Sequence, residues 1–320
     1  MTGILGSGFG IYGYLPAVLL IDDTVALLSK SKECFYLRKE LLPFAKRVIF
    51  IDDLDVFFQS VSTLIISIPP KAQFEIVDKV MKYDNIHWLF LEKPISFDPQ
   101  TSFKLKKSLD NSNKKYAICY SFLYTNWYKE LNNRILAGDK KPGLHLKVNW
   151  LFKAHHYNNN LNNWKRYVAE GGGVIRFYGI HMIAVLASLG FSDIIYSETS
   201  GYSENELALW EAEFSNPVSG STLKLFINTD YKKDSFEVSI KNKISKKKEK
   251  SENLILQSSP FGLNNLNENK IDNRILILKE YISDSYERTN SVITSVFYDQ
   301  VNSLWSNIES RSHFNYIPLK

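Results

Sequence analysis

The segment Met1-Thr2-Gly3-Ile4-Leu5-Gly6-Ser7-Gly8-Phe9-Gly10 decides how the rest of the chain is interpreted. Its first five residues are a short apolar run that predicts a buried strand, and residues 11–21 predict a helix. A strand, a glycine-rich turn and a helix at the start of an α/β chain are typical of a dinucleotide-binding unit. In such a unit the first glycine allows a tight turn, the second lets the backbone approach a diphosphate, and the helix N-terminus holds the anion.

The spacing of these glycines departs from the usual GxGxxG pattern. The third glycine should fall at Ile11, whereas the nearest glycines are Gly10 and Gly13. A tight turn that serves close packing alone is therefore an alternative to a cofactor-binding turn.

Length and composition bound the class of protein. The chain has 320 residues, of which 44% are hydrophobic, which suggests two domains or one large one, with a sizeable core. We expect no transmembrane helix and no membrane partner, because no run of about 18 uncharged apolar residues occurs. The N-terminus lacks a signal-peptide pattern, and two cysteines, Cys34 and Cys119, fit a reducing compartment. These features predict a cytoplasmic protein.

The net charge of +5 is concentrated in one run of lysines, Lys241, Lys243, Lys246, Lys247, Lys248 and Lys250. The run interrupts a strand pattern, so we interpret it as a solvated hairpin tip. Nucleic-acid binding would require basic residues spread over a face with interleaved aromatic residues. The sequence therefore predicts no nucleic-acid partner.

Apolar runs alternate with helical patterns in the first part of the chain. Strands are predicted at 24–28, 47–51, 62–68, 87–91 and 116–120, with helices at 53–59, 72–83 and 101–110. This alternation predicts an α/β fold, with a doubly wound, parallel Rossmann sheet in a dinucleotide-binding domain of residues 1–120.

The pattern changes after residue 120. Helices are predicted at 122–137, 171–189 and 291–309, and strands at 144–152, 194–202, 207–215, 222–229, 235–242 and 253–257. Consecutive strands with short turns predict an open, mainly antiparallel sheet. Residues 121–320 are thus interpreted as an α+β domain for substrate binding and oligomerisation, with a mobile loop at 258–273.

The end of the second strand bears on the choice of cofactor. Ser29-Lys30-Ser31 stands there, with Arg38 further on, and no carboxylate occupies the strand tip to bind a free ribose 2′-hydroxyl. Hydroxyl groups and a cation suit a 2′-phosphate, so we favour NADP over NAD. The alternative is that Lys30 is an ordinary surface lysine.

With these pieces in order, the chain resembles the glucose–fructose oxidoreductase and inositol dehydrogenase (Gfo/Idh/MocA) family. Three motifs carry the resemblance: the glycine turn followed by Leu15-Pro16-Ala17, Ile68-Pro69-Pro70 with Glu92-Lys93-Pro94, and Trp164-Lys165-Arg166 with Gly171-Gly172-Gly173 and Gly179-Ile180-His181. The resemblance implies hydride transfer between a sugar-like alcohol and NAD or NADP. It also implies a substrate-binding second domain whose sheet forms a homo-oligomer interface, and no metal.

The candidate catalytic residues are Lys93 and His181. Lys93 follows a predicted parallel strand, at the sheet edge where such folds bind ligands, and its ammonium can stabilise charge on a reacting oxygen. His181 matches the family's catalytic histidine and can exchange a proton with an alcohol. The alternatives are a structural lysine paired with Glu92 and a histidine of the helix core.

The other candidate site residues follow from the same motifs. The candidate cofactor-binding residues are Gly6, Ser7, Gly8, Phe9, Gly10, Ser29, Lys30, Ser31, Ile68, Pro69, Pro70, Gln73, Glu92, Lys93 and Pro94. The candidate substrate-binding residues are Lys93, Tyr120, Lys153, Trp164, Arg166, Arg176, Tyr178 and His181, and the substrate is a small sugar-like molecule that can be anionic.

The chain departs from the family pattern at three positions. Phe177 and Ala184 replace two aspartates on the helix of His181, and Gln73 replaces a histidine. Arg176, beside the first departure, suits either a substrate carboxylate or phosphate, or a salt bridge across the domain interface. One acid/base partner is therefore missing.

Two classes of function remain open at this point. The first is an NAD(P)-dependent oxidoreductase acting on a sugar, nucleotide sugar or sugar acid, in the way that family members serve surface-polysaccharide pathways. The second is a non-catalytic or regulatory cofactor-binding protein. A redox-neutral epimerase that uses bound NAD(P) lies between them.

Overall fold

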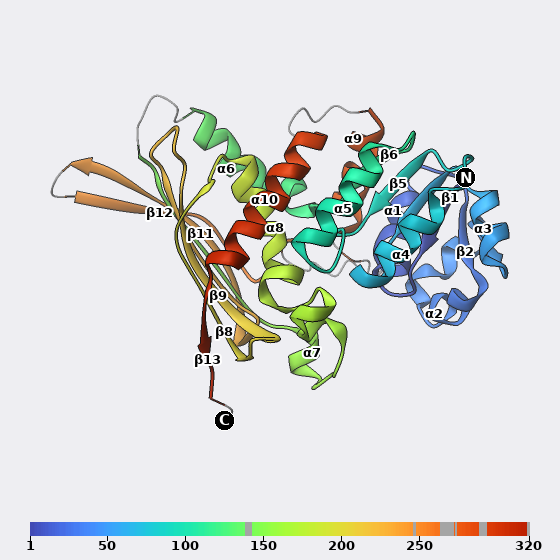
Figure 1. The fold of residues 1–320 in the computed structure, drawn as a ribbon, viewed down its shortest axis with the longest axis horizontal. Helices are drawn as coiled ribbons and strands as arrows, with labels where there is room; N and C mark the ends of the chain where they lie inside the picture. The colour runs from blue at the N-terminus through green and yellow to red at the C-terminus, as the bar shows by residue number, and fades with distance from the viewer. Residues whose placement is uncertain (138–142, 246–247, 263–271, 273, 288–292, 319–320) are drawn as a thin grey trace. The chain divides into compact units, whose positions relative to one another are not determined.

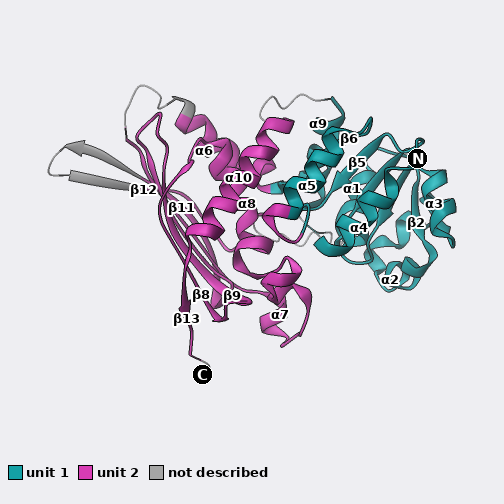
Figure 2. Ribbon diagram, viewed as in Figure 1, with its two compact units in different colours: residues 1–96, 101–121, 264–293 teal, residues 97–100, 122–263, 294–320 magenta. Residues whose placement is uncertain are grey.

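The computed structural model describes residues 1–137, 143–245, 248–262, 272, 274–287 and 293–318. The chain divides into two compact units, which Figure 2 shows in different colours. The first unit contains residues 1–96, 101–121 and 264–293, and the second contains residues 97–100, 122–263 and 294–320. The chain thus passes more than once between the units.

The first unit is built on a six-stranded parallel sheet. Its strands are β1 (Thr2–Leu5), β2 (Val25–Leu28), β3 (Val48–Ile51), β4 (Thr63–Ile66), β5 (Trp88–Leu91) and β6 (Lys115–Ile118). The strand order is β3-β2-β1-β4-β5-β6, and all neighbours pair in parallel. Every residue of β1, β2 and β4 is buried, as expected for strands that helices cover on both faces. The predicted doubly wound Rossmann sheet is confirmed.

Helical elements connect these strands or, in the case of α9, join the unit from a later part of the chain. They are η1 (Gly10–Tyr14), α1 (Leu15–Val18), η2 (Ser29–Ser31), α2 (Lys32–Tyr36), η3 (Lys39–Arg47), α3 (Leu54–Ser60), α4 (Pro70–Val80), α5 (Pro99–Asp110) and α9 (Arg274–Glu287). The predicted helix over 11–21 is instead a π-helical turn that continues into α1. Pro16 explains the irregularity, because it has no N–H with which to continue the α-helical ladder.

The second unit contains a seven-stranded sheet (Figure 1). Its strands are β7 (His145–Lys153), β8 (Asp193–Ser203), β9 (Glu206–Ser215), β10 (Thr222–Asn228), β11 (Asp230–Ser245), β12 (Lys248–Gln257) and β13 (His313–Tyr316). The order is β12-β11-β7-β10-β9-β8-β13; β7 pairs in parallel with β10 and β8 with β13, and the remaining pairs are antiparallel. The predicted open, mainly antiparallel sheet is confirmed.

Helices of the second unit pack on one face of this sheet. The helical elements are η4 (Ser121–Tyr124), α6 (Asn126–Ala137), α7 (His155–Asn158), η5 (Trp164–Arg166), η6 (Val168–Glu170), η7 (Val174–Gly179), α8 (Ile180–Ser188) and α10 (Ser295–Arg311). Along β9, Ala208, Trp210, Ala212 and Phe214 are buried and alternate with more exposed residues, which gives the strand one covered face. Figure 1 shows α8 and α10 on that side of the sheet.

The glycine triplet before η7 has a structural reason at each position. Gly171 and Gly173 have φ values of +85° and +78°, which side chains disfavour. A Cβ on Gly172 would lie 2.2 Å from the carbonyl oxygen of Trp164. The triplet therefore lets the chain turn sharply into the helix of His181 while the Trp164 turn packs against it.

Two sequence expectations fall partly outside the described residues. Strands β11 and β12 form an antiparallel hairpin around the lysine run, but Lys246 and Lys247 at its tip lie outside the described part. Most of the loop expected at 258–273 also lies outside it. Among the described residues, no helix has the length and apolar character needed to span a membrane.

Candidate functional site

The glycine turn joins the end of β1 to η1 and is shaped by one close approach. Gly6 has φ +135°, and a Cβ there would lie only 2.1 Å from the carbonyl oxygen of Ser67, which follows β4. The N–H of Ser67 in turn donates to the carbonyl of Leu5 at 2.8 Å. The turn is therefore held against the carboxyl end of the neighbouring strand, and only glycine fits at position 6.

Gly8 differs from the other glycines of the turn. A Cβ on Gly8 would meet nothing within 4 Å, and Ser7 and Gly8 are exposed. By contrast, a Cβ on Gly10 would lie 3.1 Å from Ile4 Cγ2, and one on Gly13 would lie 2.3 Å from the Phe9 ring. The protein's own packing therefore explains Gly6, Gly10 and Gly13, whereas the open side of Gly8 fits the approach of a cofactor diphosphate.

The fourth residue of the turn is enclosed by aromatic and cationic groups. The Phe9 ring packs edge-on against Tyr12 and Tyr14 at centroid distances of 5.3 and 5.5 Å. The guanidinium of Arg274, at the start of α9, lies 4.2 Å from the Phe9 centroid and is ion-paired with Asp272. Helix α9 thus supports the turn from a part of the chain more than 250 residues away in sequence.

The proposed adenosine end of the site lies after β2. Ser29, Lys30 and Ser31 form the short η2 turn, in which Ser31 is buried and Lys30 is exposed. Arg38 stacks on Tyr12 of η1, with its guanidinium carbon 4.4 Å from the ring centroid, and its Nη1 donates to Glu40 Oε1 at 3.1 Å. Arg38 is therefore held beside the helix that follows the glycine turn.

The turn that carries Lys93 follows β5 and is braced by Gln73. The Gln73 Nε2 donates to the carbonyl oxygens of Glu92, Pro94 and Ile95 at 2.8, 3.2 and 3.1 Å. Its Oε1 accepts the Glu92 N–H at 3.0 Å, and the residue is fully buried. The Lys93–Pro94 peptide bond is cis. Gln73, which stands where the family has histidine, thus fixes the backbone on both sides of Lys93.

Polar groups are buried beneath this turn. Burial raises the pKa of the Glu92 carboxyl, and the neighbouring Lys93 ammonium opposes that rise. Burial also raises the pKa of Tyr14 and of the Cys119 thiol, which lie close enough to the carboxyl to interact with it. Hydrogen bonding links the Tyr14 hydroxyl to both the Glu92 carboxyl and the Cys119 thiol. One connected set of buried polar groups therefore lies beneath the Lys93 turn.

Residues 68–70 complete the cofactor-binding candidates of the first unit. Ile68 is half-buried and Pro69 exposed, and Pro70 is the first residue of α4. They follow β4 directly, at the same carboxyl edge as the glycine turn. The structure thus brings Gly6, Ile68 and Lys93 to one edge of one parallel sheet, where such sheets bind ligands.

His181 belongs to the second unit and lies in α8. Its side chain is 7% exposed, and the imidazole stacks on Phe122 with centroids 4.5 Å apart and planes 13° apart. Phe261 packs edge-on to the same imidazole at 6.5 Å. These rings fix the plane of the imidazole.

The position of the missing aspartate is filled by an aromatic cluster. Phe177 packs edge-on against Trp164 at 5.0 Å and against Tyr178 at 4.7 Å. The Lys165 Nζ lies 5.1 Å from the Phe177 centroid and 6.0 Å from that of Trp164. Burial raises the pKa of Tyr178. No carboxylate takes the place of the aspartate within this cluster, so proton transfer there would fall to other groups.

Aromatic contacts also link this cluster to His181. The ring centroids of Tyr178 and Trp150 are 6.0 Å apart, and those of Trp150 and Phe122 are 5.3 Å apart. His181 stacks on Phe122. Three of the sequence-predicted substrate residues, Trp164, Tyr178 and His181, are thus joined by one continuous set of rings.

Two further substrate candidates belong to a separate polar group. Arg166 Nε donates to Glu206 Oε1 at 2.9 Å, and its guanidinium stacks on Tyr157 at 5.0 Å. Lys153 is exposed, and its Nζ lies 3.9 Å from Asp230 Oδ1. Tyr120, in the first unit, is almost fully buried. Their contacts with a substrate stay predictions.

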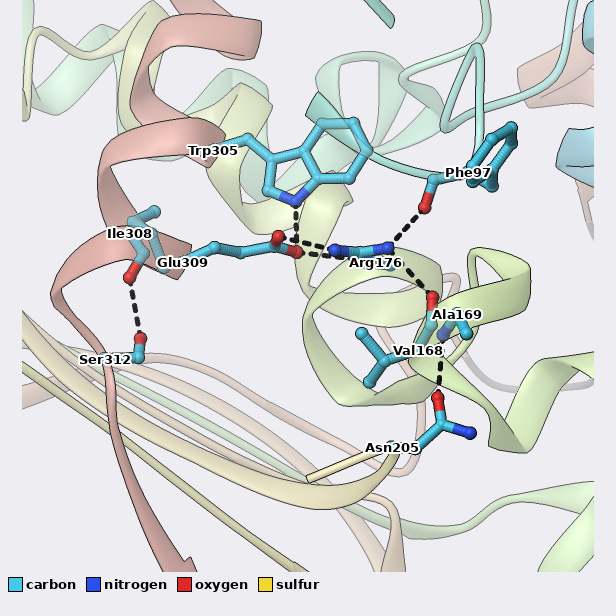
Figure 3. A network of polar contacts seen from close by, with 9 residues as sticks. All are labelled: Phe97, Val168, Ala169, Arg176, Asn205, Trp305, Ile308, Glu309 and Ser312. Carbon is cyan, nitrogen blue, oxygen red and sulfur yellow. Dashed lines mark hydrogen bonds and ion pairs between the residues drawn. The ribbon is translucent and has the colours of Figure 1, made fainter. Parts of the chain in front are cut away.

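Arg176 is held by four hydrogen bonds (Figure 3). Its Nε and Nη2 donate to the two carboxylate oxygens of Glu309 in α10, each at 2.7 Å. Its Nη1 donates to the carbonyl oxygens of Phe97 at 2.7 Å and Val168 at 2.9 Å. Of the two roles expected for Arg176, this geometry favours a salt bridge over a substrate anion, but the pair forms within the second unit and not across a domain interface.

The sequence did not reveal the structural roles of two residues, Gln73 and His156. Gln73 was identified as a departure and a cofactor contact, not as the brace of the Lys93 turn. His156 is 2% exposed, and burial together with the charges of Arg166, Lys165 and His155 lowers its pKa to about 4. No local pattern distinguishes it from His155, which is exposed. The described residues contain no cluster of three or more His, Cys, Asp or Glu suited to a metal ion.

Solved structures share this fold, although no family model and no curated protein matches the chain. The WlbA dehydrogenase from Thermus thermophilus, in complex with NAD and UDP-GlcNAcA, is 13% identical and covers 100% of this chain and 95% of its own, with a TM-score of 0.68. The 3-ketoreductase KijD10 from Actinomadura kijaniata, in complex with NADP and TDP-benzene, is 11% identical and covers 99% of both chains, with a TM-score of 0.70.

A protein with another role has the same fold. The transcriptional regulator Gal80p from Kluyveromyces lactis is 11% identical and covers 97% of this chain and 87% of its own, with a TM-score of 0.70. The similarity spans both units in each case. The chain therefore has the two-unit fold of oxidoreductases of the Gfo/Idh/MocA type, as its sequence motifs predicted.

Proposed function

We propose that the protein is an NAD(P)-dependent oxidoreductase that acts on the CH–OH group of a sugar, nucleotide sugar or sugar acid. The observation that carries the proposal is the carboxyl edge of the first sheet. There an open Gly8 and a braced Lys93 lie at the ends of strands of the same parallel sheet. Folds of this kind bind dinucleotides at that edge.

The cofactor would be held by the glycine turn, by residues 68–70 and by the Glu92-Lys93-Pro94 turn. A bound nicotinamide would supply the group that accepts or donates hydride. The residues around Gly8 would hold the diphosphate through backbone N–H groups, and η2 with Arg38 would contact the ribose and its substituent. We favour NADP, because a guanidinium and hydroxyl groups suit a 2′-phosphate, while NAD stays the alternative.

We assign the proton chemistry to Lys93 and His181. The Lys93 ammonium would donate a hydrogen bond to the substrate oxygen and stabilise the negative charge that develops on it. The His181 imidazole would take the alcohol proton during oxidation and return it during reduction. Trp164 and Tyr178 would contact the sugar through their rings, and Lys153, Arg166 and Lys93 would attract an anionic group on it.

The proposal extends to the pathway, the cellular compartment and the oligomeric state of the protein. A nucleotide-sugar substrate would suit a role in surface-polysaccharide biosynthesis in the cytoplasm, and the second sheet would form a homo-oligomer. The complexes of WlbA with UDP-GlcNAcA and of KijD10 with TDP-benzene support a nucleotide-linked substrate class.

A regulatory protein that binds the cofactor without turnover is the second candidate. Phe177 and Ala184 favour it, because neither can accept a proton, and Gal80p shows that the fold is compatible with regulation. A redox-neutral epimerase would need the same cofactor site as the dehydrogenase.

The test has two stages. The first is calorimetric titration of the protein with NADH and with NADPH; the proposal fails if neither binds. The second is turnover on a panel of nucleotide sugars by the wild type, Lys93→Met and His181→Asn. Loss of each group should lower kcat by about 10²-fold or more. Cofactor binding without any turnover across the panel would favour the regulatory candidate.

A further inference from the structure

The Arg176 network joins three segments that are distant in sequence (Figure 3). Arg176 projects from η7, Phe97 belongs to the segment 97–100, Val168 begins η6, and Glu309 lies in α10. All of these residues belong to the second unit. One guanidinium is therefore the common partner of two loop segments and one helix.

Glu309 holds the guanidinium in a fixed orientation. Both of its oxygens accept from Arg176, and its Oε1 also accepts the Trp305 Nε1–H at 2.8 Å. The Arg176 and Glu309 side chains are only 13% and 22% exposed. A bidentate arginine–carboxylate pair with this little exposure is geometrically specific, although such pairs add little net stability compared with apolar residues of the same size. Its contribution is therefore to geometry rather than to net stability.

Two of the joined segments, and the helix that carries Arg176, adjoin residues of the proposed site. Phe97 follows Lys93 by four residues in the chain, and Val168 follows the Trp164–Arg166 turn. The helix that carries Arg176 continues from η7 directly into α8, where His181 lies five residues further on. The segment that follows Lys93, the segment that follows Trp164 and the helix of His181 are thus tied to the same guanidinium.

We propose that Arg176 is a positioning residue that sets the geometry of the segment 97–100 and of the segments bearing Trp164 and His181. The inference rests on the proposed function. Phe177 removes the carboxylate that would otherwise help to orient a substrate and its proton, so alignment of the remaining groups depends on this network. Arg176 itself does not touch the reacting atoms.

The first test compares Arg176→Lys with Arg134→Lys in the cofactor-free protein. Lysine keeps the charge but cannot form two parallel bonds to Glu309 while also reaching both carbonyls. Arg134 is the matched control, because it is likewise an ion-paired arginine, with Glu130 and Glu252 as partners, but on the exposed surface of α6. Amide hydrogen exchange should become at least tenfold faster at residues 97–100 and 168–172 in Arg176→Lys alone. Unchanged exchange in those segments would show that Arg176 does not hold them in place.

The second test separates positioning from general stability. With the panel sugar that the wild type converts fastest, Arg176→Lys should lower kcat by roughly 100-fold, since misplacement of reacting groups by about 1 Å has effects of that size. The Kd for NADH or NADPH should stay within about twofold, because no cofactor-binding candidate contacts Arg176. Arg134→Lys should keep the wild-type kcat.

The outcomes distinguish this inference from the proposed function. Wild-type kcat in Arg176→Lys, or an equal loss in Arg134→Lys, would overturn the positioning role while leaving the oxidoreductase assignment intact. A wild-type protein without any turnover would overturn the positioning role together with the proposed function. Glu309→Gln, which keeps the shape of the partner but removes its charge, should lower kcat less than Arg176→Lys does.

Discussion

The buried histidine of α7 should make the stability of the protein depend on pH. His156 is almost fully enclosed, its Nδ1 has no hydrogen-bond partner among the described residues, and Tyr157 packs on its ring at 4.4 Å. Burial, reinforced by the charges of Arg166 and Lys165 and opposed by Asp230, lowers its pKa from 6.5 to about 4. The folded protein therefore keeps the imidazole neutral where the unfolded chain would protonate it.

The size of the effect follows from that difference in pKa. Above pH 6.5 the imidazole is neutral in both states, so it adds no pH dependence. As the pH falls from 6.5 towards 4, the unfolded chain binds a proton that the folded protein does not, and the free energy of unfolding decreases. Each pKa unit corresponds to about 1.36 kcal/mol, so the decrease between pH 7 and pH 4.5 is roughly 2.5 kcal/mol.

The assay is urea unfolding of the wild type and His156→Gln at several pH values between 7 and 4.5, followed by circular dichroism and tryptophan fluorescence. Other groups that titrate in this range contribute equally to both proteins, so the difference between them isolates the imidazole. The stability advantage of the wild type should shrink by roughly 2.5 kcal/mol on acidification.

Parallel curves for the wild type and His156→Gln would refute this reasoning. They would mean that the imidazole is protonated in the folded protein as readily as in the unfolded chain. The same would follow from an NMR titration in which His156 changes its protonation state near pH 6.5.

Two further predictions concern the first unit. Arg38→Ala should weaken NADPH binding by about tenfold or more, because a charge-assisted contact to phosphate contributes about 1.5–3 kcal/mol. NADH binding should stay nearly unchanged. Calorimetric titration with both cofactors checks the prediction, and equal losses of affinity for the two would contradict it. Gly6→Ala should destabilise the fold by more than about 2 kcal/mol, because its Cβ would lie 2.1 Å from the Ser67 oxygen at φ +135°; a melting temperature equal to that of the wild type would show that the turn can relax.

The parallel sheet was predictable from the sequence because its central strands are buried on both faces. Runs such as Thr63–Ile66 are rich in β-branched residues and lack the alternation of a half-exposed strand, and helical patterns separate them. This pattern predicts both the strand positions and the fold class. The glycine turn was predictable for a related reason, since Gly6 satisfies a backbone requirement that no other residue meets.

Elements that depend on distant partners were not predictable in this way. Helix α9 follows a polar, asparagine-rich stretch, and its packing against the glycine turn has no local signal. Strand β13 has only four residues, most of them exposed, and exists because it pairs with the edge of β8. Tertiary pairing, not intrinsic preference, determines such short edge strands.

In the candidate site, too, local patterns were predictable and contacts between distant residues were not. Lys93 and His181 follow from motifs, but the support around them depends on contacts across the fold. The bonds from Gln73 to the backbone of the Lys93 turn, and those from Arg176 to Phe97 and Glu309, join residues 19 to 133 positions apart. A single sequence carries no direct record of such pairs.

The central claim is that a nicotinamide dinucleotide binds across the glycine turn, and calorimetric titration of the wild type and Gly8→Asp with NADH and NADPH tests it most directly. A side chain at position 8 would enter open space, so the variant should fold and melt as the wild type does, while its carboxylate repels the diphosphate. The account predicts micromolar binding of at least one cofactor by the wild type and none by Gly8→Asp. A wild type that binds neither cofactor, or a Gly8→Asp variant that binds as tightly as the wild type, would contradict it.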